Sequence, residues 1–410
     1  MLNLQTNAQS SAHSLHQQQV HFTAPKSHRF LFLDALRGIA ALFVVGYHLS
    51  GIIPSSFAAN APLAVDFFFC LSGFVIAFTY ENRLAENLSF KDFAVARWIR
   101  LYPIYALGSL LGFLVLILVQ HYVFHAVESW SASLSFFTLA LFLWPTCLSP
   151  LSQPINYPLN IPAWSLFYEI LANFAYALLV KLRIARTSVL LCIVAGNLAL
   201  LAHVIYSGGI LDVGARQAGF GLGFARVAFS FVVGVLLCRL YRFRAHSRST
   251  NTDTHRTHWL LPLAITLALI AILNSPFSWM RTEAFRITAI ALCFPAMVYY
   301  GAVSRLPRAF ARPSTVLGEL SYPLYLLHQP FVSMMTARRL SQFLASHPTL
   351  IAWFGPCLIA ILALLSWWVG ERVDLPIRRA LTRLYNSKKP LPPISRTSIP
   401  DCEPAQQDGA

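Results

Sequence analysis

Long apolar stretches alternate with short polar segments over most of the chain. Each stretch is about 17–22 residues long, which is the length an α-helix needs to cross the hydrocarbon layer. The pattern therefore predicts an all-α fold, a polytopic integral membrane helical bundle of about ten transmembrane helices. The ten spans are expected at residues 30–50, 63–80, 101–121, 163–181, 188–206, 218–239, 259–275, 286–302, 315–335 and 350–370.

One apolar segment is too short to be an eleventh span. Residues 135–144 are apolar, and the Pro-rich segment 145–162 follows them. Because a short segment cannot cross the bilayer, we expect an external re-entrant or interfacial piece. A crossing here would move every later loop to the opposite side of the membrane.

Basic residues gather in alternate loops between the spans. Arg97 and Arg100, residues 181–186, 239–256, 305–312 and 372–389 all fall on the same side of the predicted bundle. The positive-inside rule makes that side cytoplasmic and places both termini there. The predicted organisation is a disordered cytoplasmic leader at 1–28, a ten-helix membrane domain at 29–386 and a disordered cytoplasmic tail at 387–410.

Composition supports the membrane assignment. Charged residues make up 11% of the chain and hydrophobic residues 56%, and the net charge is +15. Since the basic residues lie between apolar spans, they indicate topology in a lipid bilayer, and no nucleic-acid partner is expected. The seven cysteines are dispersed without a C-x-x-C pair, so neither a disulfide framework nor a metal site is indicated.

Arg37 and His48 are the first candidates for chemistry, because both lie in the otherwise apolar first span. Their spacing of eleven residues is about three helical turns, so both point from one face, roughly 16 Å apart along the axis. Charged and titratable groups in hydrocarbon need partners or a polar cavity. This pair therefore indicates a functional cavity inside the bundle.

The other intramembrane polar residues sort into two layers by depth. An outer layer of acids, imidazoles and a guanidinium has the groups that proton transfer needs, and a cationic inner layer suits a phosphate-bearing ligand from the cytoplasm. The outer layer is predicted to hold His48, Asp66, Glu169, Arg226 and His328, and the inner layer Arg37, Arg97, Arg100 and Glu371.

Each of these residues also has a purely structural interpretation. An intramembrane histidine can simply bond two helices together, as His48 or His328 would. Asp66 either caps the second span or orients His48. Arg97 and Arg100 are either lipid anchors or a ligand clamp.

Several catalytic signatures are absent from the sequence. There is no G-x-x-x-x-G-K-[ST], G-x-G-x-x-G, H-E-x-x-H or G-x-S-x-G motif. ATP hydrolysis, dinucleotide redox chemistry, zincin chemistry and an α/β-hydrolase nucleophile lose support. A membrane-embedded enzyme and a transporter both remain open.

Six sequence fragments, in order over about residues 30–380, resemble the acyltransferase-3 family of membrane-bound O-acyltransferases, which acylate bacterial surface glycans and other hydroxyls. The fragments are Leu33–Gly38 with His48, Val65–Phe74, Arg97–Pro103, Pro162–Glu169, Gly318–Pro330 and Glu371–Pro376. The resemblance implies a ten-helix core, a cytoplasmic acyl-CoA donor, usually acetyl-CoA, and essential roles for Arg37 and His48. The chain departs at Ile170, where relatives commonly carry a second acid beside Glu169.

Combined with the depth map, the resemblance assigns roles to individual side chains. His48 is expected to be the general base, although a covalent acyl intermediate is an alternative. The catalytic candidates are His48, Arg37, Asp66 and Glu169, and the donor-binding candidates are Arg97, Arg100 and Tyr102. The candidates for acceptor binding or oxyanion stabilisation are Ser72, Trp164, Ser165, Arg226, Ser321 and His328.

The expected function is acyl transfer from cytoplasmic acyl-CoA, a co-substrate and not a bound cofactor, to a hydroxyl of a surface or lipid-linked carbohydrate. The expected place is the bacterial cytoplasmic (inner) membrane. The outer loop 122–162 is expected to help select the acceptor. The alternatives are a transporter or flippase of a glycan precursor and a structural partner in polysaccharide assembly. The acceptor, the acyl chain and the oligomeric state stay open at this point.

Overall fold

The computed structural model describes residues 29–50, 57–119, 130–149, 154–248, 259–335 and 348–388. The first of the two units into which the chain divides runs from Lys26 to Arg378. The leader predicted at 1–28 and nearly all of the tail predicted at 387–410 lie outside the described residues. All of the candidate site belongs to the first unit.

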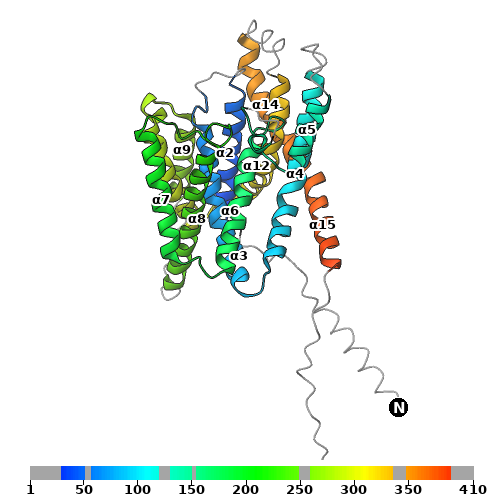
Figure 1. The fold of residues 1–410 in the computed structure, drawn as a ribbon. Coiled ribbons are helices and arrows are strands. Elements are labelled where there is room, and N and C mark those ends of the chain that lie inside the picture. The colour runs from blue at the N-terminus through cyan, green and yellow to red at the C-terminus, as the bar shows by residue number, and fades with distance from the viewer. Residues whose placement is uncertain are drawn as a thin grey trace, which may run out of the picture. The chain divides into compact units, whose positions relative to one another are not determined.

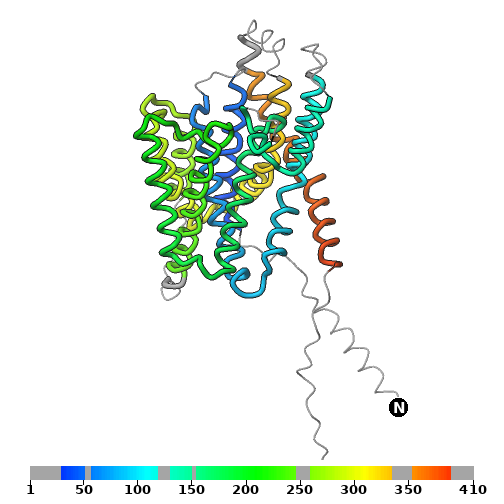
Figure 2. Tube along the Cα trace, viewed as in Figure 1, coloured from blue at the N-terminus to red at the C-terminus, as the bar shows by residue number. Residues whose placement is uncertain are grey.

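Helices build the described part of the chain, and an isolated β-bridge between Ile155 and Arg216 is the extended pairing found there. Figure 1 shows their arrangement, and Figure 2 follows the same chain as a tube. The α-helices are α2 (Leu31–His48), α3 (Ala64–Glu86), α4 (Phe90–Val119), α5 (Trp130–Leu141), α6 (Ala163–Lys181), α7 (Thr187–Tyr206), α8 (Phe220–Arg248), α9 (Leu260–Asn274), α10 (Glu283–Thr288), α11 (Phe294–Val303), α12 (Ala311–Met335), α14 (Pro348–Val369) and α15 (Leu375–Ser387). Short 3₁₀ turns are η1 (Ala61–Leu63), η3 (Thr146–Leu148), η4 (Ser278–Arg281) and η6 (Arg308–Phe310), and π-helical turns are η5 (Ala289–Cys293) and η7 (Gly370–Asp374).

The all-α membrane fold is confirmed, since each of the ten predicted spans coincides with a helix. Within the described residues, eight helices are long and apolar enough to cross a membrane, counting α10 to α11 and α14 to α15 as continuous. The other two predicted spans are α9, apolar but only 15 residues long, and α12, with 25 residues. The cytoplasmic placement of the termini stays a prediction.

The predicted start of the third span at residue 101 is wrong, because α4 begins at Phe90. The Ser89 hydroxyl accepts a hydrogen bond from the Asp92 backbone N–H at 3.0 Å, which satisfies a free donor of the first turn. The S-x-x-D pattern at residues 89–92 was the available signal for this start. Arg97 and Arg100 consequently lie inside the helix, not on a loop.

Glycines allow two helix pairs to approach closely. A Cβ atom at Gly73 of α3 would lie 1.9 Å from the Phe231 carbonyl oxygen, and one at Gly234 of α8 would lie 1.9 Å from that of Cys70. In the same way, Gly38 of α2 leaves room for α12. Small residues at these crossings let backbones pack directly, as is typical of membrane helices.

The direction of these helix pairs supports the predicted topology. Asp66, Gly73 and Glu81 of α3 contact Arg226, Phe231 and Arg239 of α8 in that order, so the two helices run parallel. In the ten-span order they are the second and sixth spans, which must run in one direction. If α5 were a further crossing, α8 would run antiparallel to α3. With 12 residues, α5 is also too short to span the bilayer, as predicted.

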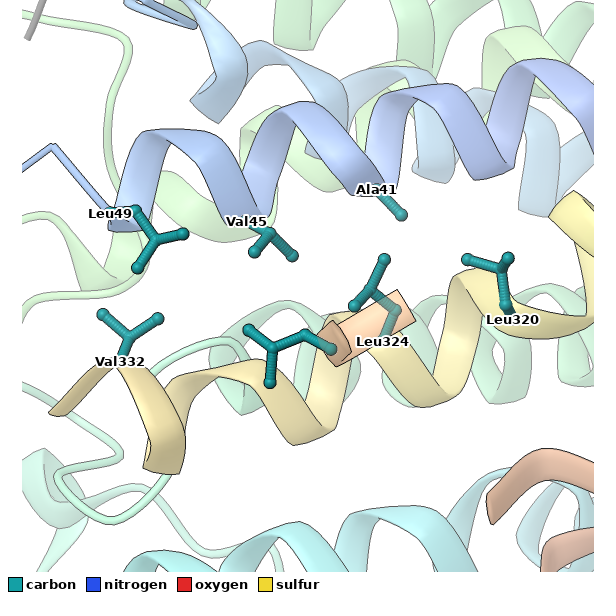
Figure 3. Packing of buried hydrophobic residues seen from close by; sticks show 7 residues of the cluster. Ala41, Val45, Leu49, Leu320, Leu324 and Val332 are labelled. Atoms are coloured by element: carbon teal, nitrogen blue, oxygen red, sulfur yellow. The ribbon is translucent and has the colours of Figure 1, made fainter. Parts of the chain in front are cut away.

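Apolar packing joins α2 to α12. In Figure 3, Ala41 and Val45 of α2 and Leu49 just after it face Leu320, Leu324 and Val332 of α12, again in parallel register. Leu362 of α14 completes this buried cluster. Both helices carry chemistry on neighbouring positions. The packing therefore fixes where Arg37 and His48 lie relative to α12.

Pro330 attaches the segment before α6 to the same helix. Proline has no N–H, so the carbonyl of Leu326, four residues earlier, loses its helical donor. The Asn160 amide nitrogen donates to that carbonyl at 3.0 Å. A break in one helix thus becomes the attachment point for a loop that lines a cavity.

We expect Gly234→Leu to destabilise the bundle by about 1–3 kcal/mol or more, because the added side chain collides with the α3 backbone. Thermal unfolding of the purified protein in detergent measures the loss. Gly196→Leu is the matched control, since that helical glycine in α7 has nothing within 4 Å of its Cβ position. Equal melting temperatures for the two variants would contradict the close approach.

Candidate active site

Two cavities inside the bundle share the side chains of Val65 and Tyr325, and we name them inner and outer after the predicted topology. The inner cavity, of about 180 Å³, is lined by Arg37, Val65, Phe68, Phe69, Leu71, Ser72, Val75, Ile76, Arg97, Arg100, Leu101, Ser165, Leu166, Glu169, Ser321, Tyr322, Tyr325 and Leu326. The outer cavity, of about 200 Å³, is lined by Val44, Tyr47, His48, Pro62, Val65, Ile155, Ile161, Pro162, Trp164, Asp212, Ala215, Arg216 and Tyr325.

The inner cavity is rich in guanidinium groups. Arg37 comes from α2, and Arg97 and Arg100 come from α4, one turn apart. The carboxylate among its lining residues is Glu169, which accepts hydrogen bonds from Ser72 at 2.7 Å and from Arg97 at 3.3 Å. Three cations against one anion leave the cavity positively charged.

Among the described residues, one hydrogen-bond donor of the Arg97 guanidinium has no partner. Its side chain is 13% exposed, and its Nε lies buried without a hydrogen-bond partner among the described residues. A buried unsatisfied donor costs about 1–3 kcal/mol, and more when it belongs to a charged group. Such a group is suited to an oxygen acceptor that arrives with a ligand.

Arg37 is held in place by α12. Its Nε donates to the Ser321 hydroxyl at 2.9 Å, and its Nη2 donates to the Gly318 carbonyl at 2.8 Å and to Asp34 at 3.0 Å. Ser321 in turn donates to the Gly318 carbonyl. These bonds orient one edge of the guanidinium while the residue lines the inner cavity.

In the outer cavity His48 is paired with a second histidine. His48 Nδ1 lies 2.9 Å from the Val44 carbonyl and 3.2 Å from His328 Nε2, and His328 Nδ1 lies 2.9 Å from the Leu324 carbonyl. A carbonyl can only accept, so we assign the hydrogen to Nδ1 in each neutral ring. His328 Nε2 is then an acceptor for His48, and the lone pair of His48 lies on Nε2.

Tyr325 and Val65 form the partition, since they line both cavities. Tyr325 is 8% exposed, and its hydroxyl lies 2.8 Å from the Ser165 hydroxyl. Ser165 also donates to the Pro162 carbonyl, which begins the turn into α6. Tyr325 therefore borders both the cationic cavity and the cavity that His48 lines.

Asp66 and Arg226 form a buried ion pair. Arg226 is 1% exposed and donates to both Asp66 oxygens, to the Pro62 and Val213 carbonyls, and lies over the Trp164 ring at 5.6 Å. Ser230 also donates to Asp66. Both charges are thus fully occupied by protein groups.

These contacts correct several predicted roles. The partner that the structure gives His48 is His328, not Asp66 or Glu169, because Asp66 is bound to Arg226 and Glu169 lies with Arg97 in the inner cavity. Glu169 and Arg97 were predicted in different layers, yet the two side chains meet, because α4 begins earlier than expected and carries Arg97 inside the bundle. Arg226 is bonded to Asp66 and to the Pro62 and Val213 carbonyls, so a part in oxyanion binding stays a prediction.

Tyr102 does not line the inner cavity, contrary to its predicted part in donor binding. Each residue turns an α-helix by about 100°, so Tyr102 leaves the face that Arg97 and Arg100 share. Its hydroxyl donates to the Leu141 carbonyl at 3.0 Å, and its ring stacks on Trp98. The residue joins α4 to α5.

The remaining candidates fall beside one cavity or the other. Ser72, Ser165 and Ser321 line the inner cavity, and Trp164 lines the outer cavity. Among the described residues, no group of three or more His, Cys, Asp or Glu side chains gathers in a way that could hold a metal ion.

Asp212 and Arg216 also line the outer cavity, although neither was among the site residues predicted from the sequence. They lie on the connection between α7 and α8, where a charge is ordinary, so nothing in the pattern set them apart. The Ile155–Arg216 bridge joins this connection to the segment before α6. Ile155, Ile161 and Pro162, from the loop predicted to select the acceptor, line the outer cavity.

The chain matches known proteins over most of its length. A family model described as an acyltransferase domain, Acyl_transf_3, matches residues 30–371. Protein 2 of the picA locus of Rhizobium radiobacter is 35% identical over 162 residues, which cover 36% of this chain and 81% of that protein. No solved structure matches.

Two longer relatives are named as O-acetyltransferases. The putative peptidoglycan O-acetyltransferase YrhL of Bacillus subtilis is 27% identical over 75% of this chain and 50% of its own length. The peptidoglycan O-acetyltransferase OatA of Listeria monocytogenes is 26% identical over 74% of this chain and 49% of its own length. The chain thus spans about half the length of these two proteins. With the family model covering residues 30–371 of an all-helical multi-pass bundle, the chain belongs to the acyltransferase-3 family of membrane acyltransferases.

Proposed function

We propose that this membrane acyltransferase moves an acyl group, acetyl in the first instance, from cytoplasmic acyl-CoA to a hydroxyl of a surface or lipid-linked carbohydrate in the bacterial inner membrane. The observation that carries the proposal is the pair of cavities that meet at Tyr325, one lined by three arginines and the other by His48. The names of the two O-acetyltransferase relatives support a glycan acceptor.

The inner cavity is the donor side in this proposal. Arg97, Arg100 and Arg37 offer guanidinium groups to the phosphates of CoA, and bidentate Arg–phosphate bonds are among the strongest hydrogen bonds in proteins. The unpartnered Arg97 Nε supports an anionic ligand there. The apolar lining, including Phe68 and Phe69, suits the thioester arm on its way to the partition.

The outer cavity is the acceptor side, and His48 is the base. His48 Nε2 takes the proton of the acceptor hydroxyl while the hydroxyl oxygen attacks the thioester carbonyl carbon. The carbon–sulfur bond then breaks, the new ester carries the acyl group, and the sulfur leaves as thiolate. The proton returns from His48 to this thiolate, so the products are an ester and free CoA thiol. A positioned base contributes about 10²–10⁴ in rate.

His328 is a positioning residue in this reaction. When Nε2 of His48 takes the proton, the ring becomes a cation inside the bundle. Its Nδ1–H faces two acceptors, the Val44 carbonyl and His328 Nε2, which stabilise that charge. Because Ser165 already donates to the Pro162 carbonyl, the candidate to donate to the thioester oxygen as it becomes negative is the Tyr325 hydroxyl, which would turn its hydrogen away from Ser165.

The transporter alternative explains buried charges but not their division between two cavities. A flippase needs a path that a whole glycan precursor can follow. Here Tyr325 and Val65 separate the cavities, so a two-carbon group at the partition fits better than a bulky molecule. Membership of the acyltransferase-3 family favours transfer as well.

The direct test uses inverted membrane vesicles, which present the cytoplasmic side to acetyl-CoA labelled in its acetyl group. We expect label in one carbohydrate or lipid fraction with the wild-type protein, and at least about 10²-fold less with His48→Ala, because the base is gone. His203→Ala, an exposed histidine of α7, is the matched control and should retain activity.

Two outcomes would contradict the proposal in different ways. A fully active His48→Ala protein would show that His48 is not the base, and the proposal of acyl transfer itself would stand. Absence of transfer from acetyl-CoA, succinyl-CoA and longer acyl-CoA donors in vesicles that hold folded protein would refute the proposed function and favour transport.

We expect Arg97→Gln to raise the Michaelis constant for acetyl-CoA about tenfold to a hundredfold, since hydrogen bonds to charged groups contribute about 1.5–3 kcal/mol. Initial rates over a range of acetyl-CoA concentrations measure the change. Arg308→Gln, which removes an exposed charge between α11 and α12, should leave the constant unchanged. An unaltered constant in Arg97→Gln would make this residue a topology signal only.

We expect Tyr325→Ala to uncouple CoA release from acetyl transfer. Removing the side chain between the cavities would let water from the outer cavity reach and hydrolyse the thioester. CoA release and acetyl transfer, measured in one sample, should then diverge, with more CoA released per acetyl group transferred. Val65→Ala, a smaller cut in the same partition, should show a weaker effect, and Tyr325→Phe should keep the wild-type ratio. Wild-type ratios in folded Tyr325→Ala and Val65→Ala proteins would overturn the role of the partition.

A further inference from the structure

The Asp66–Arg226 ion pair has no part in the transfer steps above, yet its burial is costly. Taking two charges out of water costs several kcal/mol per ion, which is recovered only with good geometry and further hydrogen bonds. Part of Arg226 is directed at the chain before α8, where Nη1 donates to the Val213 carbonyl at 3.1 Å and lies 3.7 Å from Asp212. The ion pair therefore anchors the segment 211–217.

A second anchor comes from α10. The Leu211 backbone N–H donates to Glu283 at 2.9 Å, and Arg286 pairs with the other Glu283 oxygen at 2.6 Å. Asp212 is thus fixed on both sides, through the N–H of the residue before it and the carbonyl of the residue after it. Loops that are merely connections seldom receive such support.

The third anchor is the bridge to the segment before α6. The Asn156 N–H donates to the Ala215 carbonyl at 3.0 Å, and the Gln217 N–H donates to the Pro154 carbonyl at 3.1 Å. Gly214, with φ of +113°, lies against Trp164, and a Cβ there would be 2.6 Å from the indole ring. A side chain at this position would meet both backbone strain and a clash.

This rigid segment presents two charged side chains to the outer cavity. Asp212 and Arg216 line that cavity together with His48, and the Asp212 side chain is 48% exposed. Arg216 is exposed, and no carboxylate of the described residues lies within 4.0 Å of its guanidinium. Three anchors thus hold the backbone that carries Arg216, whose guanidinium has no carboxylate partner among the described residues.

We propose that the segment 211–217 recognises the acceptor, and that the acceptor is an acidic sugar unit. Arg216 binds its anionic group, a carboxylate or a phosphate, in the bidentate geometry that guanidinium favours. Asp212 accepts hydrogen bonds from the hydroxyls of the same unit. This inference rests on the proposed function and specifies its substrate class.

The dimensions of the cavity agree with one sugar unit as the bound part. At about 200 Å³ it is smaller than the roughly 300–1,000 Å³ of pockets that enclose drug-sized ligands. The rest of a glycan would extend away from the cavity. With the anionic group at Arg216 and hydroxyls at Asp212, another hydroxyl of the same unit would face His48.

The test measures acceptor-stimulated CoA release by the full chain in detergent, with acetyl-CoA as donor. The acceptor probes are methyl glucoside, methyl glucuronide and glucose 1-phosphate, which are neutral, carboxylated and phosphorylated. We expect the wild-type protein to prefer an acidic probe, and whichever acidic probe is preferred identifies the anionic group. Arg216→Gln should raise the Michaelis constant for that probe about tenfold or more, because an ionic hydrogen bond is lost.

The same variant also provides the controls. Its Michaelis constants for methyl glucoside and for acetyl-CoA should stay at the wild-type values, since neither contact involves Arg216. Arg216→Lys should recover part of the preference for the acidic probe. Asp212→Asn should raise the constants for all three sugars, because every one of them presents hydroxyls.

Several results would overturn the inference without touching acyl transfer itself. One is a wild-type preference for the neutral sugar. Another is an equal effect of Arg216→Gln on neutral and acidic probes, and a third is no response to any sugar from protein that still acetylates its native membrane fraction. A different result would refute the proposed function itself: no acyl-CoA donor would then label any membrane fraction.

Discussion

The close parallel contact of α2 with α12 is the constraint on which the site depends. Gly38 and Gly318 remove the side chains that would keep these helices apart, and the apolar cluster in Figure 3 fixes their register. That register sets Arg37 beside Ser321 and His48 beside His328. A shift of either helix by one turn, about 5.4 Å, would break both pairs together. The two ends of the site are therefore not independent.

Some charged side chains of the bundle have protein partners for their hydrogen bonds, and others of the described residues do not. Asp66 and Arg226 bond to each other, and Arg239 and Arg242 of α8 are bonded to Glu81 and to backbone carbonyls. By contrast, Arg97 retains a buried free donor and Arg216 has no carboxylate partner among the described residues. Inside the bundle an unpaired charge is costly, so the buried free donor of Arg97 suits an anionic ligand, whereas the fully bonded groups hold the helices together.

The apolar runs and the two polar residues of the first span predicted much of this from sequence. Length and hydropathy are properties of single segments, so the helices and the shared face of Arg37 and His48 followed directly. The partners of Asp66 and Glu169 did not, because depth along a helix says nothing about its rotation toward a neighbour. Asp212 and Arg216 were missed for another reason, since their placement comes from three anchors on other elements.

The partition formed by Tyr325 and Val65 has an electrical consequence under the proposed function. A transporter must alternate between two open states, whereas a reaction across one side chain needs no aqueous passage at all. The bilayer keeps its resistance to ions while a small neutral fragment changes sides. The thioester alone then supplies the driving force, and the enzyme can work without drawing on the membrane potential.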